Sequence, residues 1–203
     1  VKRGTQILEV DGADFVNGNN VDVIDAGLFP VETGESHDFK LLEPDGTIIT
    51  KTLVSADVVS SPVKNTKVID TEVGKVGYLQ FNSHIGLAQE GLIAAVKQFS
   101  DENVSEVVVD LRYNGGGLAY MASQFAYMIA GDNATNNRIF EQKIFNDKYP
   151  STDPVTGESL SPMPFYDKKI DYVVYKFTSE DLPSLDLQRI FVLTTGSTCS
   201  ASE

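Results

Sequence analysis

Residue types that commonly build metal sites and cross-links are scarce in this 203-residue sequence. The one cysteine, Cys199, excludes an internal disulfide and a metal site made of several cysteines. The two histidines, His37 and His84, lie far apart, and no ligand spacing around them indicates zinc. We therefore expect a protein that uses neither a metal ion nor another cofactor.

Basic residues and long apolar runs are scarce as well. Sixteen lysines and arginines stand against 29 acidic residues, and the net charge of −13 argues against a nucleic-acid-binding surface and against contact with anionic membranes. No run approaches the roughly 18 apolar residues that cross a membrane, and no signal peptide is visible. Because the sequence opens at Val1 inside what looks like a domain, the missing signal peptide says nothing about location.

The apolar content of 41% is enough to build a core, and the first third of the sequence predicts a small α+β unit. We expect strands at 6–10, 39–42 and 47–53 and a helix at 21–28. Pro44-Asp45-Gly46 predicts a hairpin turn between the last two strands.

Residues 2–12 (KRGTQILEVDG) resemble the x-x-G-D-x-I-x-x-V-N-G segment of PDZ domains, with Thr5 where that pattern usually has aspartate. PDZ domains bind peptide C-termini by adding a strand beside a carboxylate-binding loop, and that loop would precede Val1. The resemblance therefore implies the rear half of a PDZ domain. The alternative is an unrelated small α+β unit.

A linker is predicted after this unit. Residues 54–73 lack a regular period and contain several serines, Pro62 and a polar stretch. We place the boundary near Pro62, which gives a domain at 1–62 and a second at 63–203.

The second domain reads as an α/β core. Strands at 76–81 and 107–111 enclose a helix at 87–100, and the second strand is a continuous apolar run of the kind found in parallel sheets. Three glycines at 115–117 precede a helix at 118–129. They lack the spacing of phosphate-binding motifs, so the open alternatives are an oxyanion hole and an ordinary tight turn.

The end of the sequence carries a candidate nucleophile. An apolar strand at 190–193 is followed by residues 196–203 (GSTCSASE). A serine at a strand-to-helix turn exposes its Oγ and lies beside backbone N–H groups that can stabilise an oxyanion. On these residues alone, a simple helix cap is the alternative.

Three segments look, in order, like the motifs of the C-terminal processing peptidases, also called tail-specific proteases. They are 77–81 (GYLQF), 109–117 (VDLRYNGGG) and 198–203 (TCSASE), against the family patterns G-Y-I/L, D-L-R-x-N-P/G-G-G and S/T-A-S-A-S-E. The resemblance implies an α/β fold, with a crotonase/ClpP-like βαβ protease core preceded by the partial PDZ-like α+β domain. It does not cover about 131–188, which we expect to form a cap or insertion.

Position by position, the resemblance also implies catalytic roles. Ser200 matches the nucleophile, and the N–H of Ala201 would be one oxyanion donor. The second donor would come from the glycine loop, from Gly116 first and Gly117 next. Cys199 stands where the family usually has alanine, and we expect its side chain to pack inward.

The general base is the part of the site that this sequence does not supply. In the family, a lysine beyond the nucleophile takes the serine proton, and the sequence ends at Glu203. The chain by itself should therefore be inactive. His84 is the alternative base, because a Ser–His pair also suits acyl transfer.

Two further expectations concern structure. Asp110 and Arg112 should fix the glycine loop by ion pairing or backbone hydrogen bonds. Within the cap, strands are predicted at 139–145 and 172–177.

The activity that the resemblance implies is serine endopeptidase cleavage of polypeptides through an acyl-enzyme on Ser200. A different class stays open, a non-catalytic binding module on the same fold that carries apolar ligands or serves as a peptide-binding scaffold. A downstream lysine would discriminate between the two. The resemblance implies a periplasmic or cell-envelope location and polypeptide partners, and it leaves self-association open.

Overall fold

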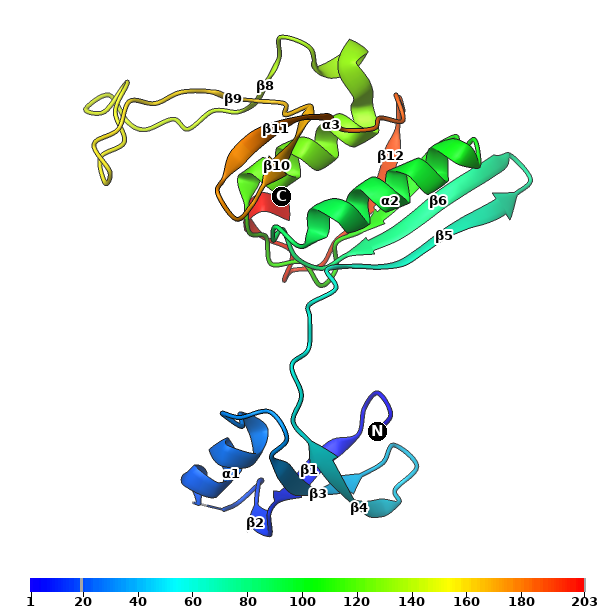
Figure 1. Ribbon diagram of the computed structural model, residues 1–203, viewed down its shortest axis with the longest axis vertical. Coiled ribbons are helices and arrows are strands. Elements are labelled where there is room, and N and C mark those ends of the chain that lie inside the picture. The colour runs from blue at the N-terminus through cyan, green and yellow to red at the C-terminus, as the bar shows by residue number, and fades with distance from the viewer. Residues whose placement is uncertain (19, 203) are drawn as a thin grey trace. The chain divides into compact units, whose positions relative to one another are not determined.

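The computed structural model describes residues 1–18 and 20–202, and Glu203, the last residue of the third motif, lies outside them. The chain forms two compact units, Val1–Val59 and Ser60–Glu203 (Figure 1). Among the described residues, no helix is both long and apolar enough to cross a bilayer.

The first unit is an antiparallel sheet of four strands, in the order β2-β1-β3-β4, with one helix. Its elements are β1 (Gln6–Val10), β2 (Ala13–Asp14), α1 (Val21–Leu28), β3 (Ser36–Leu42) and β4 (Ile48–Val54). Val10, Phe39 and Leu41 form the core on which α1 packs. The helix comes close to the sheet because Gly27 has no side chain, and an added Cβ would lie 2.3 Å from Val10 Cγ1. The predicted strands, helix and hairpin of this unit are confirmed.

The second unit is built on a four-stranded sheet in the order β12-β7-β6-β5. β6, β7 and β12 run parallel, and β5 pairs antiparallel with β6. The elements are β5 (Val63–Thr71), β6 (Gly74–Phe81), α2 (Ala88–Asp101), β7 (Glu106–Asp110), α3 (Ala119–Thr135) and β12 (Ile190–Leu193). The predicted α/β arrangement, with a helix between successive parallel strands, is confirmed.

Alternate residues of the central strands face the two helices, which lie next to each other in Figure 1. This follows from the two-residue period of a strand. The core consists mainly of Leu79, Phe81, Val107 and Val109 from the sheet with Leu92, Phe99, Met121 and Met128 from α2 and α3. Tyr78 and Val108 point to the other face and are half-buried. The helices and the core strands thus hold the ends of β6, β7 and β12 in fixed positions.

The linker prediction for residues 54–73 is wrong over about half of its length. Only residues 55–62 lack regular structure, and β5 occupies most of the remainder at the edge of the sheet. An edge strand tolerates polar side chains, and the register of β5 shifts between Lys64 and Lys67. Both features remove the regular alternation by which a strand is predicted.

The segment between α3 and β12 contains two short antiparallel hairpins. They pair β8 (Ile139–Glu141) with β9 (Met163–Pro164), and β10 (Lys168–Asp171) with β11 (Lys176–Asp181). The predicted strand at 172–177 is wrong, because residues 172–175 form the turn of the second hairpin. Asp171 Oδ1 accepts a hydrogen bond from Val173 N at 2.9 Å, and Tyr175 has a φ of 51°. Local turn bonding of this kind overrides the strand preference of valine and tyrosine.

Candidate active site

The carboxyl ends of three parallel strands bring three loops together. Residues 82–87 follow β6, residues 111–118 follow β7, and residues 194–199 follow β12. This edge of a parallel sheet is where α/β folds commonly bind ligands. All five predicted site residues lie on or next to these loops, namely His84, Gly116, Gly117, Ser200 and Ala201.

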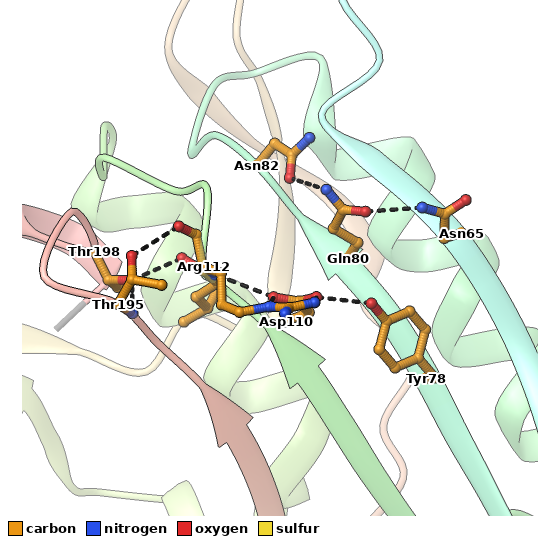
Figure 2. A network of polar contacts seen from close by, with 9 residues as sticks. Asn65, Tyr78, Gln80, Asn82, Asp110, Arg112, Thr195 and Thr198 are labelled. Atoms are coloured by element: carbon orange, nitrogen blue, oxygen red, sulfur yellow. Dashed lines mark hydrogen bonds and ion pairs between the residues drawn. The ribbon is translucent and has the colours of Figure 1, made fainter. Parts of the chain in front are cut away.

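Asp110 and Arg112 fix the start of the glycine loop, as predicted. Arg112 donates from Nε to Asp110 Oδ1 at 2.9 Å and from Nη2 to Oδ2 at 2.7 Å. Tyr78 Oη donates to the same Oδ2 at 2.7 Å (Figure 2). The guanidinium first, and the tyrosine hydroxyl after it, outweigh burial and lower the pKa of Asp110 to about 2. The carboxylate is therefore ionised at neutral pH.

Two threonines hold the turn after β12 against the loop after β7. Thr195 Oγ1 donates to Arg112 O at 2.9 Å, and Thr198 Oγ1 donates to Leu111 O at 2.8 Å (Figure 2). Thr198 Oγ1 also accepts from Thr195 N at 3.0 Å, which closes the turn on itself. The segment that carries Ser200 is thereby attached to the segment that carries the glycines.

Asn114 is fully buried and connects all three loops. Its Oδ1 accepts from Gly116 N at 2.9 Å and from Ser202 Oγ at 2.7 Å, and it lies 3.1 Å from His84 Nδ1. Its Nδ2 donates to Phe81 O at 2.9 Å. A single amide group therefore sets the relative positions of the glycine loop, the histidine and the turn after β12.

Gly116 and Gly117 have φ values of 93° and 134°, which other residues rarely adopt. An added Cβ on Gly116 would lie 2.5 Å from Ser200 Cβ and 2.9 Å from Ala201 N. On Gly117 it would lie 2.4 Å from His84 O. The two glycines thus allow the loop to touch the serine turn on one side and the histidine segment on the other.

The N–H groups of the two glycines differ in availability. Gly116 N–H is bonded to Asn114 Oδ1. Within residues 1–18 and 20–202, neither Gly117 N–H nor Ala201 N–H has a hydrogen-bond partner. These two donors are therefore the ones left for a ligand.

Ser200 begins η1 (Ser200–Ser202), a single turn of 3₁₀ helix, and is exposed. Its φ of 58° is in the left-handed region, which is uncommon for serine and is found at the sharp turns that present nucleophiles. Among the described residues, nothing forms a hydrogen bond with its Oγ. The hydroxyl is thus accessible from solvent.

His84 is 3% exposed, and its ring centroid lies 4.3 Å from that of Phe81. Burial lowers the pKa of His84, against smaller opposing contributions from Asn114 and the Gly116 backbone. Its Nδ1 lies 3.4 Å from Ser202 Oγ. In the described part of the chain no bond joins His84 to Ser200, so the structure brings this candidate base to the site but places it beside a different serine.

The prediction that Cys199 packs inward is wrong, because this cysteine is exposed. Its Sγ donates to Gly115 O at 3.4 Å. The neighbouring Thr198 is turned toward Leu111, which directs the next side chain outward. Residues 1–18 and 20–202 contain no group of three or more His, Cys, Asp or Glu side chains that could hold a metal ion.

Five residues of this network carry no predicted role, and one of them, Thr195, lies outside the matched motifs. Asn114, Thr198, Ser202 and Tyr78 all lie inside the three matched motifs, so the family resemblance marks their positions. Their partners are distant in sequence, and only the folded structure identifies them.

The sequence of this chain matches a known protein family. The profile of Peptidase family S41 matches residues 75–203, which is more than half of the chain. The chain is 27% identical over 143 residues to "Carboxyl-terminal-processing peptidase 1, chloroplastic" of Arabidopsis thaliana, a match that covers 66% of this chain and 28% of the relative.

A solved structure also resembles this chain. It is that of a protein assigned to the S41 proteases from Bacteroides fragilis NCTC 9343, with a TM-score of 0.60 and 22% identity, and it shows a shared fold. The match covers 100% of this chain and 50% of that one, so the chain spans about half of the solved relative. On the extent of the profile match, this chain belongs to peptidase family S41.

Proposed function

We propose that the protein is a serine endopeptidase of the carboxyl-terminal-processing type, and that Ser200 is its nucleophile. The observation that carries the proposal is the conformation of Ser200, which is exposed, has a φ of 58° and contacts the glycine loop. The name of the Arabidopsis relative and the family membership support the same reaction class.

In the proposed mechanism, Ser200 Oγ attacks the carbonyl carbon of the scissile peptide bond and loses its proton to a base. The carbonyl oxygen becomes an oxyanion that accepts hydrogen bonds from the N–H groups of Ala201 and Gly117. We favour Gly117 over Gly116 because Gly116 N–H already donates to Asn114. One such donor stabilises the transition state by about 3 kcal/mol. The protonated base gives its proton to the nitrogen, the C–N bond breaks and the amine leaves. Water, deprotonated by the same base, then attacks the acyl carbon, and Ser200 Oγ leaves with the proton to release the acid.

The proposed base is a lysine outside the described residues 1–18 and 20–202. Within the described residues no lysine or histidine side chain is bonded to Ser200, and His84 Nδ1 lies beside Ser202 instead. A neutral lysine near the serine is the base that the family resemblance implies, and burial would lower its pKa enough to accept the proton.

Three finer features belong to the same proposal. The α/β unit is a crotonase/ClpP-like protease core, which the βαβ order of β6, α2 and β7 supports. The first unit is the rear part of a PDZ domain, supported by the match of residues 2–12 to the PDZ pattern. The substrates are polypeptides that the protein meets in the periplasm or cell envelope.

The test is peptide-bond hydrolysis by the full-length protein and by two serine variants. Ser200→Ala should reduce hydrolysis of unfolded casein by about a thousandfold or more, with an unchanged circular dichroism spectrum. Ser197→Ala, on the same exposed turn, should keep wild-type activity. Casein hydrolysis at wild-type rate by Ser200→Ala would exclude Ser200 as the nucleophile.

A further inference from the structure

An aromatic pocket lies at the first turn of α3, three residues after Gly117. It has a volume of about 240 Å³ and is lined by Tyr120, Tyr166, Ile170, Tyr172, Tyr175 and Phe177. Tyr120 comes from the first turn of α3, and the other residues come from the segment 166–177 that contains β10 and the start of β11. Five of the six lining side chains are aromatic, and none carries a charge.

The rings form a partly open wall rather than a closed core. The centroid of Tyr166 lies 5.4 Å from that of Tyr120 and 4.6 Å from that of Phe177. Tyr120 is 42% exposed, Tyr175 66% and Phe177 48%. A ligand that covers this ring surface removes apolar area from water, which lowers the free energy of binding.

A buried polar network fixes the position of this wall. Tyr172 Oη donates to Gln124 Oε1 at 2.7 Å, and Gln124 Nε2 donates to Gln89 Oε1 at 3.0 Å. Gln89 bonds both N and O of Ile170, at 2.9 and 3.0 Å. On α3, Ser123 Oγ accepts from Tyr166 N at 2.9 Å. Helices α2 and α3 thus hold the pocket in a preformed shape, which reduces the entropy lost on binding.

Both sides of the pocket are linked to the glycine loop, one through α3 and the other through the loop after β6. Tyr120 is three residues after Gly117, so their Cα atoms are at most about 11 Å apart. On the other side, Tyr172 packs on Gly86, where an added Cβ would lie 2.7 Å from Tyr172 Cβ. Two residues earlier, His84 forms a parallel bridge with Gly117. An extended peptide advances about 3.3 Å per residue, so the separation of Gly117 and Tyr120 corresponds to at most about three residues of a bound chain.

The charges around the pocket favour an uncharged occupant. Lys168 and Lys169, next to the lining residue Ile170, are paired, Lys169 with Glu90 and Glu180, and Lys168 with Asp181. No free carboxylate lines the aromatic wall to attract a cation, and no cation lines it to attract an acid. The volume suits one large apolar side chain.

We propose that this aromatic pocket is a substrate subsite that takes an aromatic or large aliphatic side chain of the polypeptide, two to four residues from the scissile bond. The proposal rests on the proposed peptidase function, since it places the pocket along the path of the bound chain. It identifies the β10–β11 hairpin as a determinant of specificity.

The experiment uses the full-length protein and a series of fluorogenic peptides in which one position at a time holds Phe, Leu or Ala. At one position, two to four residues from the cleaved bond, the wild-type protein should prefer Phe and Leu over Ala by about tenfold or more in kcat/KM. Phe177→Ala and Tyr120→Ala should reduce that preference to less than about threefold, through a larger loss of kcat/KM for the Phe and Leu peptides than for the Ala peptide. Tyr120→Phe, which keeps the ring, should retain it.

Tyr149→Ala is the matched control, because Tyr149 is also 42% exposed and does not line the pocket. It should keep the wild-type preference. An equal loss for the Phe and Ala peptides in the pocket variants, or an unchanged preference, overturns the subsite.

Binding separates this proposal from the proposed function. The Ser200→Ala variant should bind the labelled Phe peptide more tightly than the Ala peptide in fluorescence anisotropy, and adding Phe177→Ala should abolish the difference. If the wild-type protein cleaves no peptide but this binding preference is found and lost as stated, the peptidase proposal fails and the pocket stands. If Ser200→Ala binds both peptides alike, the pocket proposal fails.

Discussion

At the scale of single residues, the glycine loop offers two neighbouring positions with opposite tolerance. A Cβ on Gly116 would collide with the Ser200 turn, and its φ of 93° is unfavourable for alanine. We expect Gly116→Ala to reduce kcat/KM of the full-length protein about a hundredfold, because a shift of about 1 Å at the nucleophile is enough for such a loss. Steady-state kinetics on a fluorogenic peptide measure it.

Gly115→Ala is the control for that change. A Cβ on Gly115 meets nothing within 4 Å, and its φ is outside the left-handed region. This variant should retain activity within about threefold of wild type. Equal losses in the two variants would show that the loop responds to any added side chain, and that contact with Ser200 is irrelevant.

The same residues show how far a sequence can identify a site. The matched motifs place Ser200, Gly116 and Gly117 on loops that meet in the structure. They do not show that Gly116 N–H is used by Asn114, nor that Cys199 is exposed. Both facts depend on where a side chain points inside a turn, and this is decided by bonds between residues more than 80 positions apart, such as Thr198 to Leu111.

At the scale of elements, the sequence predicts strands and helices correctly where their apolar residues recur with a regular period and are buried in the structure. The strands and helices around the core, from β6 to α3, have apolar residues at the spacing of their element. The prediction failed for β5, whose exposed edge tolerates polar residues, and for the turn at 172–175, where the Asp171 side chain bends the backbone. In both cases interactions with solvent or with a nearby side chain outweighed intrinsic preference.

The end of β7 provides a prediction at this scale. Asp110 is fully buried, and its pKa is lowered from 3.8 to about 2, so its ionised form stabilises the folded state. Asp110→Asn should lower the free energy of unfolding by about 2 kcal/mol at pH 7. Because the folded pKa is below the unfolded one, the contribution is complete above about pH 4 and disappears as the pH falls to about 2.

Urea denaturation at several pH values measures this effect. The difference between wild type and Asp110→Asn should shrink as the pH falls from 4 toward 2. Asp101→Asn, at an exposed acid in the same unit, should change the free energy of unfolding by no more than about 0.5 kcal/mol at either pH. A pH-independent difference for Asp110→Asn would contradict the ionic role of this side chain.

At the scale of the whole molecule, the two units each contain one histidine, and the two imidazoles have opposite surroundings. His37 Nδ1 lies 2.6 Å from Asp11 Oδ2, and this carboxylate raises the pKa of His37 above its usual 6.5. Burial lowers the pKa of His84 below that value. The sequence has no other histidine, so two imidazole signals should be resolved in a proton NMR titration.

The expected result is one midpoint above pH 6.5 and one below it, with His37→Gln removing the higher and His84→Gln the lower. The stability consequences have opposite signs. The contribution of His37 is complete below pH 6.5 and is lost as the pH rises through its raised pKa, whereas that of His84 is complete above pH 6.5 and is lost as the pH falls through its lowered pKa. Acidification from pH 8 to pH 5 should therefore stabilise the first unit through His37 and destabilise the second through His84. Two coincident midpoints near 6.5 would refute both assignments, because neither the Asp11 contact nor the burial of His84 would then be present in solution.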